Sequence, residues 1–289
     1  MYHNQSLSFI AKCLTVSNKK KDRLDFENCI KSIEVDWDHF VKLSTTHYIL
    51  PAIYCNLKKN VFLSFIPKDV VGYMKYLTDL NRSRNEEILD QLTQINNLLL
   101  NEQIMPIFIK GSANLISGLY YDIGERMIGD IDFLVCKKDY LKAVEVLRKN
   151  GYNNLFKHEK NVAPDAKHYP RLIHSQKIAA VEVHKELIKN KYNQEFNYEL
   201  VKSKIQKIND FFLLSNKHQI ATSIISNQID DYGYDFKYIS LRNAYDVLLL
   251  SQYESPKSVI LNFELLRHPM NCFLAICYDI FSAKNSFDY

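Results

Sequence analysis

The first hundred residues carry apolar positions at a helical period. The clearest series contains Ile88, Leu92, Ile95 and Leu99. Spacings of four, three and four residues place these side chains on one face of a helix. Pro67 fits the first turn of this helix, which we predict to run to about Glu102, because proline there removes an N–H that has no helical partner. We therefore predict a helical N-terminal region over residues 1–102.

The pattern changes near Pro106, where short apolar runs alternate with amphipathic stretches. Five of the seven glycines fall between Gly111 and Gly151, so backbone freedom is concentrated in this part of the chain. The pattern predicts strands at 104–109, 130–135, 152–157, 171–174 and 177–184, and helices at 111–120 and 138–150. Alternating strands and helices are typical of a small α/β sheet, which we expect to occupy residues 103–190.

Helical periodicity returns after about residue 190. Apolar stripes predict helices at 217–230, 238–253, 258–267 and 270–283. Gly233, Pro256 and Pro269 lie between these helices, as residues that interrupt helices commonly do. The predicted fold class is therefore α+β, with a small mixed β-sheet flanked by an N-terminal helical region and a C-terminal helical region over residues 191–289.

Composition and charge narrow the choice of partners. Hydrophobic residues make up 47% and charged residues 24% of the 289-residue chain, which is ordinary for a globular protein. The net charge of +4 suits an anionic ligand but gives no reason to expect duplex DNA as a partner. We also expect no membrane partner, because no apolar run is long enough to span a bilayer and the N-terminus lacks a secretory signal.

The six cysteines show no CxxC pairing and no regular spacing. They are Cys13, Cys29, Cys55, Cys136, Cys272 and Cys277. This arrangement indicates free thiols rather than a disulfide framework or a zinc site. Free thiols are typical of a reducing compartment, so a cytoplasmic location is expected.

Two carboxylates lie one residue apart in an apolar run, GDIDFLV, at residues 129–135. Side chains alternate between the faces of a strand, so Asp130 and Asp132 should project together while Ile131 and Phe133 face the core. Carboxylates this close repel each other unless a cation lies between them, and Mg²⁺ prefers such oxygen ligands. The alternative is an Asp-x-Asp pair on an exposed strand edge, which is common in proteins without a metal.

A third carboxylate would complete a two-metal site. Metals about 4 Å apart can promote in-line attack on a nucleoside triphosphate, and the third carboxylate would hold the second metal and take the proton of the attacking hydroxyl. Glu182 is the candidate, since it lies in an apolar run, AAVEVH at 179–184, where a lone glutamate is costly to bury without a cation. His184 shares its strand face by the same alternation.

A glycine turn precedes the carboxylates in the sequence. Gly111 and Ser112 open a predicted helix, so their backbone N–H groups and the serine hydroxyl are candidates for binding a triphosphate. In many proteins a Gly-Ser pair at such a turn only caps the helix. Lys110 and Arg126 are further candidates for phosphate contacts, with surface ion pairs as the alternative. The partners in such pairs would be Asp122 or Glu125.

The order of these motifs resembles the DNA polymerase β-like nucleotidyltransferase superfamily, and most closely its uncharacterised bacterial nucleotidyltransferase family proteins. Their pattern is matched by Lys110-Gly111, Leu119-Tyr120, Arg126, the GDIDFLV run, Gly151-Tyr152 and Val181-Glu182-Val183-His184. The stretches His168-Tyr169-Pro170 and Ile173-His174 resemble the histidine-containing segment of those proteins. Specific motifs cover residues 107–187, and the helical flanks match only in general character.

The resemblance implies a nucleotidyltransferase core and a set of site residues. Asp130 and Asp132 would bind both catalytic Mg²⁺ (or Mn²⁺) ions, with Glu182 as third ligand and base. Gly111 and Ser112 would hold the β- and γ-phosphates, although the gap from Gly111 to Asp130 is longer than in the compact members of the superfamily. Possible site-lining residues, each with a structural role as its alternative, are His168, His174 and His184.

The resulting hypothesis is an enzyme that transfers a nucleoside monophosphate from an NTP, ATP included, to a hydroxyl of an acceptor and releases pyrophosphate. The acceptor stays open between a small molecule, a protein and an RNA end. The alternative is a catalytically weak binding or antitoxin-type protein with a nucleotidyltransferase fold. Mutual repulsion within an idle cluster of three carboxylates argues against this alternative.

Overall fold

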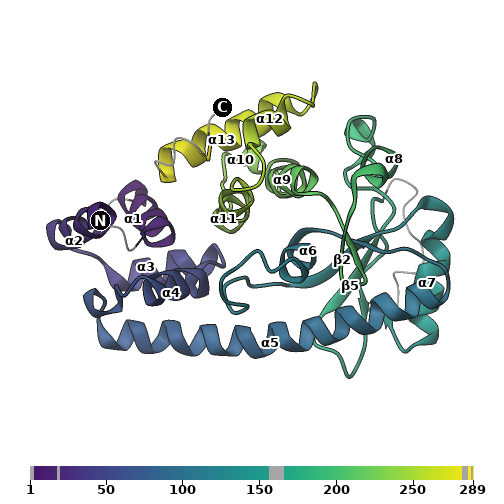
Figure 1. The fold of residues 1–289 in the computed structure, drawn as a ribbon, viewed down its shortest axis with the longest axis horizontal. Coiled ribbons are helices and arrows are strands. Elements are labelled where there is room, and N and C mark those ends of the chain that lie inside the picture. The colour runs from purple at the N-terminus through teal and green to yellow at the C-terminus, as the bar shows by residue number, and fades with distance from the viewer. Residues whose placement is uncertain (1–2, 18–19, 156–165, 282–285, 288) are drawn as a thin grey trace.

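Helix α5 (Lys68–Asn101) is the longest element and runs along one side of the whole molecule (Figure 1). The structure, a computed structural model, describes residues 3–17, 20–155, 166–281, 286–287 and 289. With 34 residues, α5 extends over about 50 Å. Pro67 and Glu102 flank the helix, so the long helix predicted from the sequence is confirmed.

The N-terminal region is helical, as predicted. Before α5 the chain forms α1 (His3–Thr15), α2 (Lys20–Ser32), α3 (Trp37–Thr46), α4 (Leu50–Lys59) and a 3₁₀ turn, η1 (Leu63–Phe65). Asp36 caps α3 by accepting a hydrogen bond from the His39 N–H. Figure 1 shows these helices gathered at one end of α5.

The described residues form a seven-stranded mixed sheet, which confirms the α+β class. In spatial order the strands are β3 (Asn153–Asn154), β4 (Leu172–Ile173), β5 (Ala180–His184), β2 (Asp130–Leu134), β1 (Ile107–Phe108), β7 (Phe211–Leu213) and β6 (Gln206–Ile208). The pairs β2–β5 and β1–β7 are parallel, and the other neighbours are antiparallel. The strands are shorter than predicted, and residues 156–157 of the strand predicted at 152–157 lie outside the described residues.

The hairpin of β6 and β7 corrects the expectation that only helices follow residue 190. Each strand has three residues, which is too few for an alternation of apolar and polar residues to be recognised in the sequence. Asn209 makes the turn between them with φ 51°, a left-handed conformation that asparagine tolerates better than most residues. The sheet therefore continues past residue 190, while the domain boundary proposed there stays a prediction.

Helices cover the sheet and build the C-terminal region. Within the core these are α6 (Lys110–Ile116), η2 (Lys137–Asp139) and α7 (Tyr140–Lys149). The later ones are η3 (Asn190–Tyr192), α8 (Tyr198–Val201), η4 (Lys202–Lys204), α9 (Asn216–Ile225), a π-helical turn η5 (Ser226–Asp230), α10 (Gly233–Phe236), α11 (Leu241–Leu250), α12 (Pro256–Ile260) and α13 (Arg267–Phe281). Residues 282–283 of the last predicted helix lie outside the described residues.

Two hydrophobic cores organise the molecule. One lies between the sheet and its helices and includes the fully buried α5 positions of the predicted series, from Ile88 to Leu99. The other joins the N-terminal helices to the C-terminal ones, with Phe9 of α1 and Phe273 of α13 among its members. Met74 places the first half of α5 in this second core. The two helical regions, distant in sequence, therefore pack as one unit.

The loop between α6 and β2 is held against α5 by two buried asparagines. Asn81 donates hydrogen bonds to the carbonyl oxygens of Gly124 and Arg126, at 2.7 and 3.1 Å. Asn85, one helical turn later, donates to the carbonyls of Ile123 and Arg126, at 2.6 and 2.8 Å. Because buried backbone carbonyls need partners, these amides fix the course of the loop that carries Arg126.

The six cysteines are free, as the sequence predicted. Cys13, Cys55 and Cys277 are buried, and burial raises the pKa of each of these thiols well above its ordinary range. Thiols with a raised pKa are poor nucleophiles, so these three have packing roles. Across the described residues, no helix combines the length and the apolar character that crossing a membrane requires.

Candidate active site

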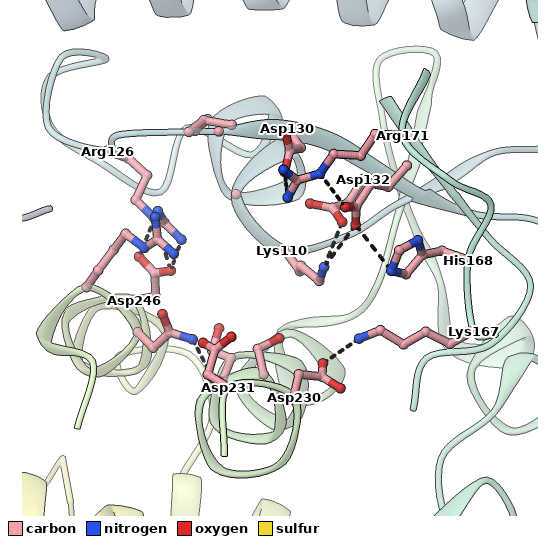
Figure 2. Close-up of a pocket in the computed structure, with 18 of the residues that line it drawn as sticks. Lys110, Arg126, Asp130, Asp132, Lys167, His168, Arg171, Asp230, Asp231 and Asp246 are labelled. Atoms are coloured by element: carbon pink, nitrogen blue, oxygen red, sulfur yellow. Dashed lines mark hydrogen bonds and ion pairs between the residues drawn. The ribbon is translucent and has the colours of Figure 1, made fainter. Parts of the chain in front are cut away.

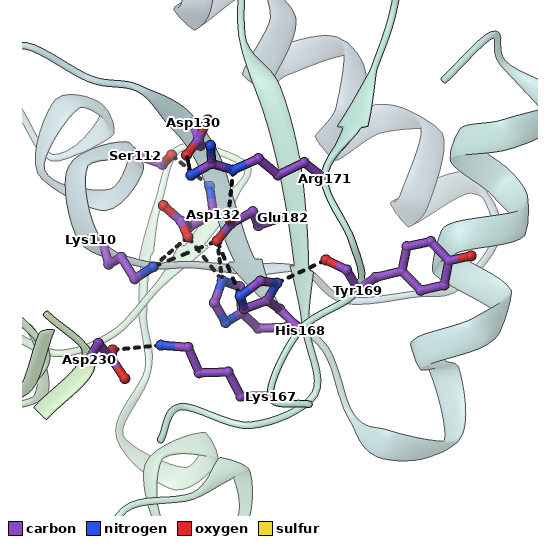
Figure 3. A network of polar contacts seen from close by, with 11 residues as sticks. Lys110, Ser112, Asp130, Asp132, Lys167, His168, Tyr169, Arg171, Glu182 and Asp230 are labelled. Carbon is purple, nitrogen blue, oxygen red and sulfur yellow. Dashed lines mark hydrogen bonds and ion pairs between the residues drawn. The ribbon is translucent and has the colours of Figure 1, made fainter. Parts of the chain in front are cut away.

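Parallel pairing of β2 with β5 brings the predicted carboxylates together. The register places Asp132 opposite Glu182, and neighbouring strands lie about 4.8 Å apart. The two side chains therefore lie side by side, with Asp130 close to both (Figure 3). Ile131 and Phe133 are fully buried, which confirms the predicted alternation along β2. The carboxylates have side-chain exposures of only 20% (Asp130), 10% (Asp132) and 9% (Glu182).

Two cationic side chains balance this cluster. Lys110 Nζ lies 2.7 Å from Asp132 Oδ1 and 4.0 Å from Glu182 Oε2. Arg171 bridges Asp130 and Glu182, because its Nη2 lies 2.7 Å from Asp130 Oδ2 and its Nε donates to Glu182 Oε1 at 2.9 Å. Arg171 was not predicted as a site residue. It immediately precedes β4, and no local pattern shows that β4 lies beside β5.

The backbone at Lys110 has an uncommon conformation. Its φ of 54° lies in the left-handed region, which costs a residue with a side chain about 1–3 kcal/mol and is found often at functional sites. Gly111 follows, and a Cβ added there would lie 3.3 Å from Ile128 Cγ1. Glycine at position 111 therefore lets the turn pack closely against Ile128, and the turn carries the lysine amine that reaches Asp132.

Ser112 makes a buried contact with the carboxylate strand. Its side chain is fully buried, and its hydroxyl accepts a hydrogen bond from the Asp132 N–H at 3.2 Å. It thus ties the start of α6 to β2, whereas Lys110 and Gly111 line the neighbouring cavity. In this arrangement Ser112 supports the carboxylate strand, and its predicted phosphate contact stays a prediction.

Two of the three predicted histidines lie at the carboxylates. His184 is fully buried, and its Nε2 lies 2.9 Å from Asp132 Oδ1. Because a carboxylate can only accept, Nε2 must carry a proton. His168 lies beside His184, with ring centroids 5.0 Å apart, and its Nε2 is 3.9 Å from Glu182 Oε2. His174 instead packs near Tyr152, with ring centroids 5.2 Å apart.

The charges around Asp132 and Glu182 keep both groups ionised. Burial favours the protonated form of each, but Lys110 and the hydrogen bond from His184 outweigh it and hold the pKa of Asp132 below its ordinary value. For Glu182, burial is likewise outweighed by His184, His168 and Lys110, and its pKa lies well below its usual range. Asp130 differs, because burial dominates and raises its pKa despite Arg171.

Arg126 forms a buried ion pair with Asp246 of α11. Its Nε contacts both carboxylate oxygens, at 3.0 and 3.1 Å, and its Nη2 donates to Oδ2 at 2.8 Å. The Tyr120 hydroxyl donates to Oδ1 of the same carboxylate at 2.6 Å. Side-chain exposures are 8% for Arg126 and 2% for Asp246. The predicted alternative, a surface ion pair of Arg126, is therefore wrong.

The carboxylates proposed as surface partners of Lys110 and Arg126, which are Asp122 and Glu125, have other partners. Asp122 accepts from Arg82, whose Nη2 lies 3.0 Å away. Glu125 is buried and accepts hydrogen bonds from the Asp122 N–H at 3.0 Å and the Tyr245 hydroxyl at 3.1 Å. The segment from Tyr120 to Arg126 is thus attached to α11 through two adjacent residues, Tyr245 and Asp246.

The carboxylates open onto a cavity of about 450 Å³, which lies within the range of small-molecule sites. Figure 2 shows Asp130 and Asp132 with Lys110 and Arg171 at one side, and Arg126 with Asp246 across from them. The π-helical turn after α9 supplies Asp230, which pairs with Lys167 at 2.5 Å and so links two sides of the cavity. Lining residues without a predicted role include Lys167, Arg171, Asp230, Asp231, Arg242 and Asp246.

The donor set fits a hard divalent cation. Asp132, Glu182 and His184 each offer one ligand atom within 4.8 Å of the others. The proton on His184 Nε2 is donated to Asp132, so this ring orients a carboxylate, and oxygen atoms remain as the ligands. Mg²⁺ and Mn²⁺ prefer oxygen ligands. The positions of Lys110 and Arg171 between these oxygens also mark where positive charge is favoured.

We expect Glu125 to make stability depend on pH. Burial, the largest cause, raises its pKa from the ordinary 4.5 to about 7. The folded state therefore holds this proton more tightly than the unfolded state, and the stability contribution is complete below pH 4.5 and is lost as pH rises to about 7. The loss corresponds to about 3 kcal/mol. Denaturant unfolding of wild type and Glu125→Gln at pH 4.5 and pH 8 measures it.

Glu125→Gln removes the titration and retains a side chain of the same shape. Its stability relative to wild type should therefore rise between pH 4.5 and pH 8 by the amount that wild type loses at this residue. The matched control is Glu87→Gln, on the exposed face of α5, which should leave the pH dependence of wild type unchanged. The prediction would be contradicted if the free energies of unfolding of Glu125→Gln and wild type differed by the same amount at both pH values.

Comparison with known families agrees with this geometry. A family model described as uncharacterised nucleotidyltransferase matches residues 34–281, a span that contains every strand of the sheet and all residues of the cavity. A search of curated proteins finds no match to the chain. Because the family match covers far more than half of the 289 residues, the chain belongs to the family of uncharacterised nucleotidyltransferases.

Proposed function

We propose that this nucleotidyltransferase moves a nucleoside monophosphate from an NTP to a hydroxyl group of an acceptor, with Mg²⁺ or Mn²⁺ as cofactor. The observation that carries the proposal is the register of β2 on β5, which sets Asp132 beside Glu182 at the cavity. With Asp130 they form a group of three carboxylates, and such a group is suited to bind two divalent cations.

The cations would supply stabilisation of the charge that develops on the triphosphate during in-line attack. Asp130, Asp132 and Glu182 would hold them. His184 keeps Asp132 in one orientation by donating to its Oδ1, since a carboxylate fixed by a hydrogen bond is a better organised ligand. The lowered pKa of Glu182 keeps this group ionised, as a ligand must be, and makes it a weak acceptor for the hydroxyl proton.

Lys110 and Arg171 are the groups placed to contact phosphate. Both already lie among the carboxylate oxygens, and a bound cation would weaken their attraction to those oxygens. We expect them to turn to the phosphate oxygens of the NTP, for which arginine offers two donors and lysine a compact charge. Arg171 has the freedom to do so, because its side chain is 51% exposed.

One observation favours the second candidate function, a catalytically weak binding protein. Repulsion within an idle carboxylate cluster was the reason to prefer an enzyme over such a protein. Lys110 and Arg171 neutralise much of that repulsion without any metal. Metal-dependent binding of a nucleotide therefore has to be measured in order to separate the two functions.

The test is transfer of label from an α-labelled NTP. Each of the four NTPs is incubated with the protein, Mg²⁺ or Mn²⁺, and cell lysate fractions that contain small molecules, proteins or RNA. We expect one fraction to acquire label, since the α-phosphate stays with the transferred nucleotide. Chelation of the metal with EDTA is the control and should abolish labelling. Calorimetry with Mg²⁺ and each NTP completes the test, and absence of metal-dependent binding would support the second candidate.

A further inference from the structure

Arg242 lines the cavity and forms no ion pair with any residue in the described part of the chain. It lies in the first turn of α11, and its guanidinium contacts the ring of Tyr48, with 5.1 Å between Cζ and the ring centroid. Its Nε is buried and makes no hydrogen bond to the described residues. A buried N–H of a cation that has no hydrogen-bond partner is costly, so the position requires a physical explanation.

The natural partner of Arg242 is already engaged. Asp246 follows four residues later on α11 and shares its helix face, the spacing at which arginine and aspartate commonly pair. Both oxygens of Asp246 are taken by Arg126, and the Tyr120 hydroxyl donates to one of them. The result is two guanidinium groups and one carboxylate on this wall of the cavity, with an excess of one positive charge.

The surroundings of Arg242 disfavour its charged form. Arg126 is the largest cause and burial the second, and together they lower the pKa of Arg242 to about 10, although Asp246 and Asp231 act in the opposite direction. Asp231 is exposed and forms no ion pair with Arg242 within the described part of the chain. An anion that enters the cavity would therefore find a guanidinium that no ion pair within the described residues neutralises.

We propose that Arg242, together with Arg126, binds a phosphate-type oxyanion of a substrate on the cavity wall that faces the carboxylates. Arginine guanidinium groups suit this role because their donors match the oxygens of phosphate in pairs. The inference rests on the proposed function, since the same cavity would hold the nucleotide. It adds Arg242 of α11 to the site, a residue outside the segment 107–187 that carries the family motifs.

The oxyanion has two possible sources with the same chemistry. It is either the β- and γ-phosphates of the NTP, which leave as pyrophosphate, or an acidic group on the acceptor. In Figure 2, Arg126 and Asp246 lie across the cavity from Asp130 and Asp132. Titration with an NTP separates the sources, because only the first predicts a loss of NTP affinity when Arg242 is changed.

The experiment is calorimetric titration of inorganic pyrophosphate into the full-length protein in EDTA. We expect wild type to bind and Arg242→Gln to bind about 10- to 100-fold more weakly, the usual effect of a lost hydrogen-bonded charge. Arg242→Lys should recover part of the affinity, because it restores the charge without the paired donors. Arg23→Gln, on α2 and outside the cavity, is the matched control and should bind like wild type.

Two results would overturn the proposal: wild type that binds no pyrophosphate, or Arg242→Gln and Arg242→Lys that both bind it as wild type does. Circular dichroism of each variant verifies folding, and Arg242→Lys keeps the test decisive if the glutamine variant does not fold. A parallel loss of NTP affinity assigns the subsite to the polyphosphate, and unchanged NTP affinity assigns it to the acceptor. Because EDTA removes the metal, a failure of metal-dependent nucleotidyl transfer would not affect the result of the pyrophosphate titration. Equally, a failure to bind pyrophosphate would not affect the measurement of nucleotidyl transfer.

Discussion

Asp132→Asn is expected to lower nucleotidyl transfer about a thousandfold while the fold stays intact. Asp132 is the centre of the cluster, because it lies beside Glu182 and accepts from both Lys110 and His184. A neutral amide in its place would lose most of its attraction for a divalent cation. Metal-assisted charge stabilisation is worth several kcal/mol, and about 4 kcal/mol corresponds to a thousandfold in rate. Label transfer from an α-labelled NTP measures the effect.

The controls for this variant separate chemistry from folding. Asp90→Asn changes a carboxylate on the exposed face of α5 and should transfer label at the wild-type rate. Asp130→Asn should also lose transfer, since Asp130 belongs to the same cluster. Circular dichroism of both site variants is expected to match wild type, because asparagine has the shape of aspartate. Full activity in Asp130→Asn and Asp132→Asn would refute the metal-dependent mechanism.

Asp246→Asn is expected to destabilise the protein by about 3–5 kcal/mol, the usual effect of removing one partner from a buried ion pair. Two guanidinium groups, those of Arg126 and Arg242, would then lie on the cavity wall without a carboxylate between them. Asparagine retains an oxygen for the Tyr120 hydroxyl, so the lost charge is the main change. Urea unfolding at neutral pH measures the difference in free energy of unfolding.

A second substitution distinguishes the ion pair from general disruption of packing. Arg126→Met added to Asp246→Asn should restore much of the lost stability, because it removes the cation left behind. Asp79→Asn is the control for charge alone, since Asp79 pairs with Lys75 and Arg82 on the surface of α5 and is 44% exposed. It should change the unfolding midpoint little. A double variant no more stable than Asp246→Asn would contradict the role of the ion pair.

Local patterns in the sequence were sufficient to predict the carboxylate strand. The face that a side chain occupies depends only on its position along the strand, so the sequence alone places Asp130 and Asp132 opposite Ile131 and Phe133. Glu182 could be found for a similar reason, as a charge in an apolar run. The long helix α5 followed from its apolar period and from Pro67.

Longer-range features could not be predicted from the sequence because nothing local encodes them. The strands β6 and β7 are too short to show a period. The place of β7 beside β1 depends on pairing with a segment about 100 residues away in the chain. Arg171 lies next to Glu182 only because β4 pairs with β5. Arg126 was recognised as a candidate, but its partner Asp246 is 120 residues later in the chain.

The sequence by itself determined the family pattern, the α+β class and the three carboxylates, since periodicity and motif order are properties of neighbouring residues. Only the tertiary structure decided how these groups are neutralised and what faces them. The register of β2 on β5 set Asp132 beside Glu182, and the packing of α11 placed Arg242 and Asp246 on the same cavity. The physical reason is that charges interact through space over a few ångströms, whatever their separation along the chain.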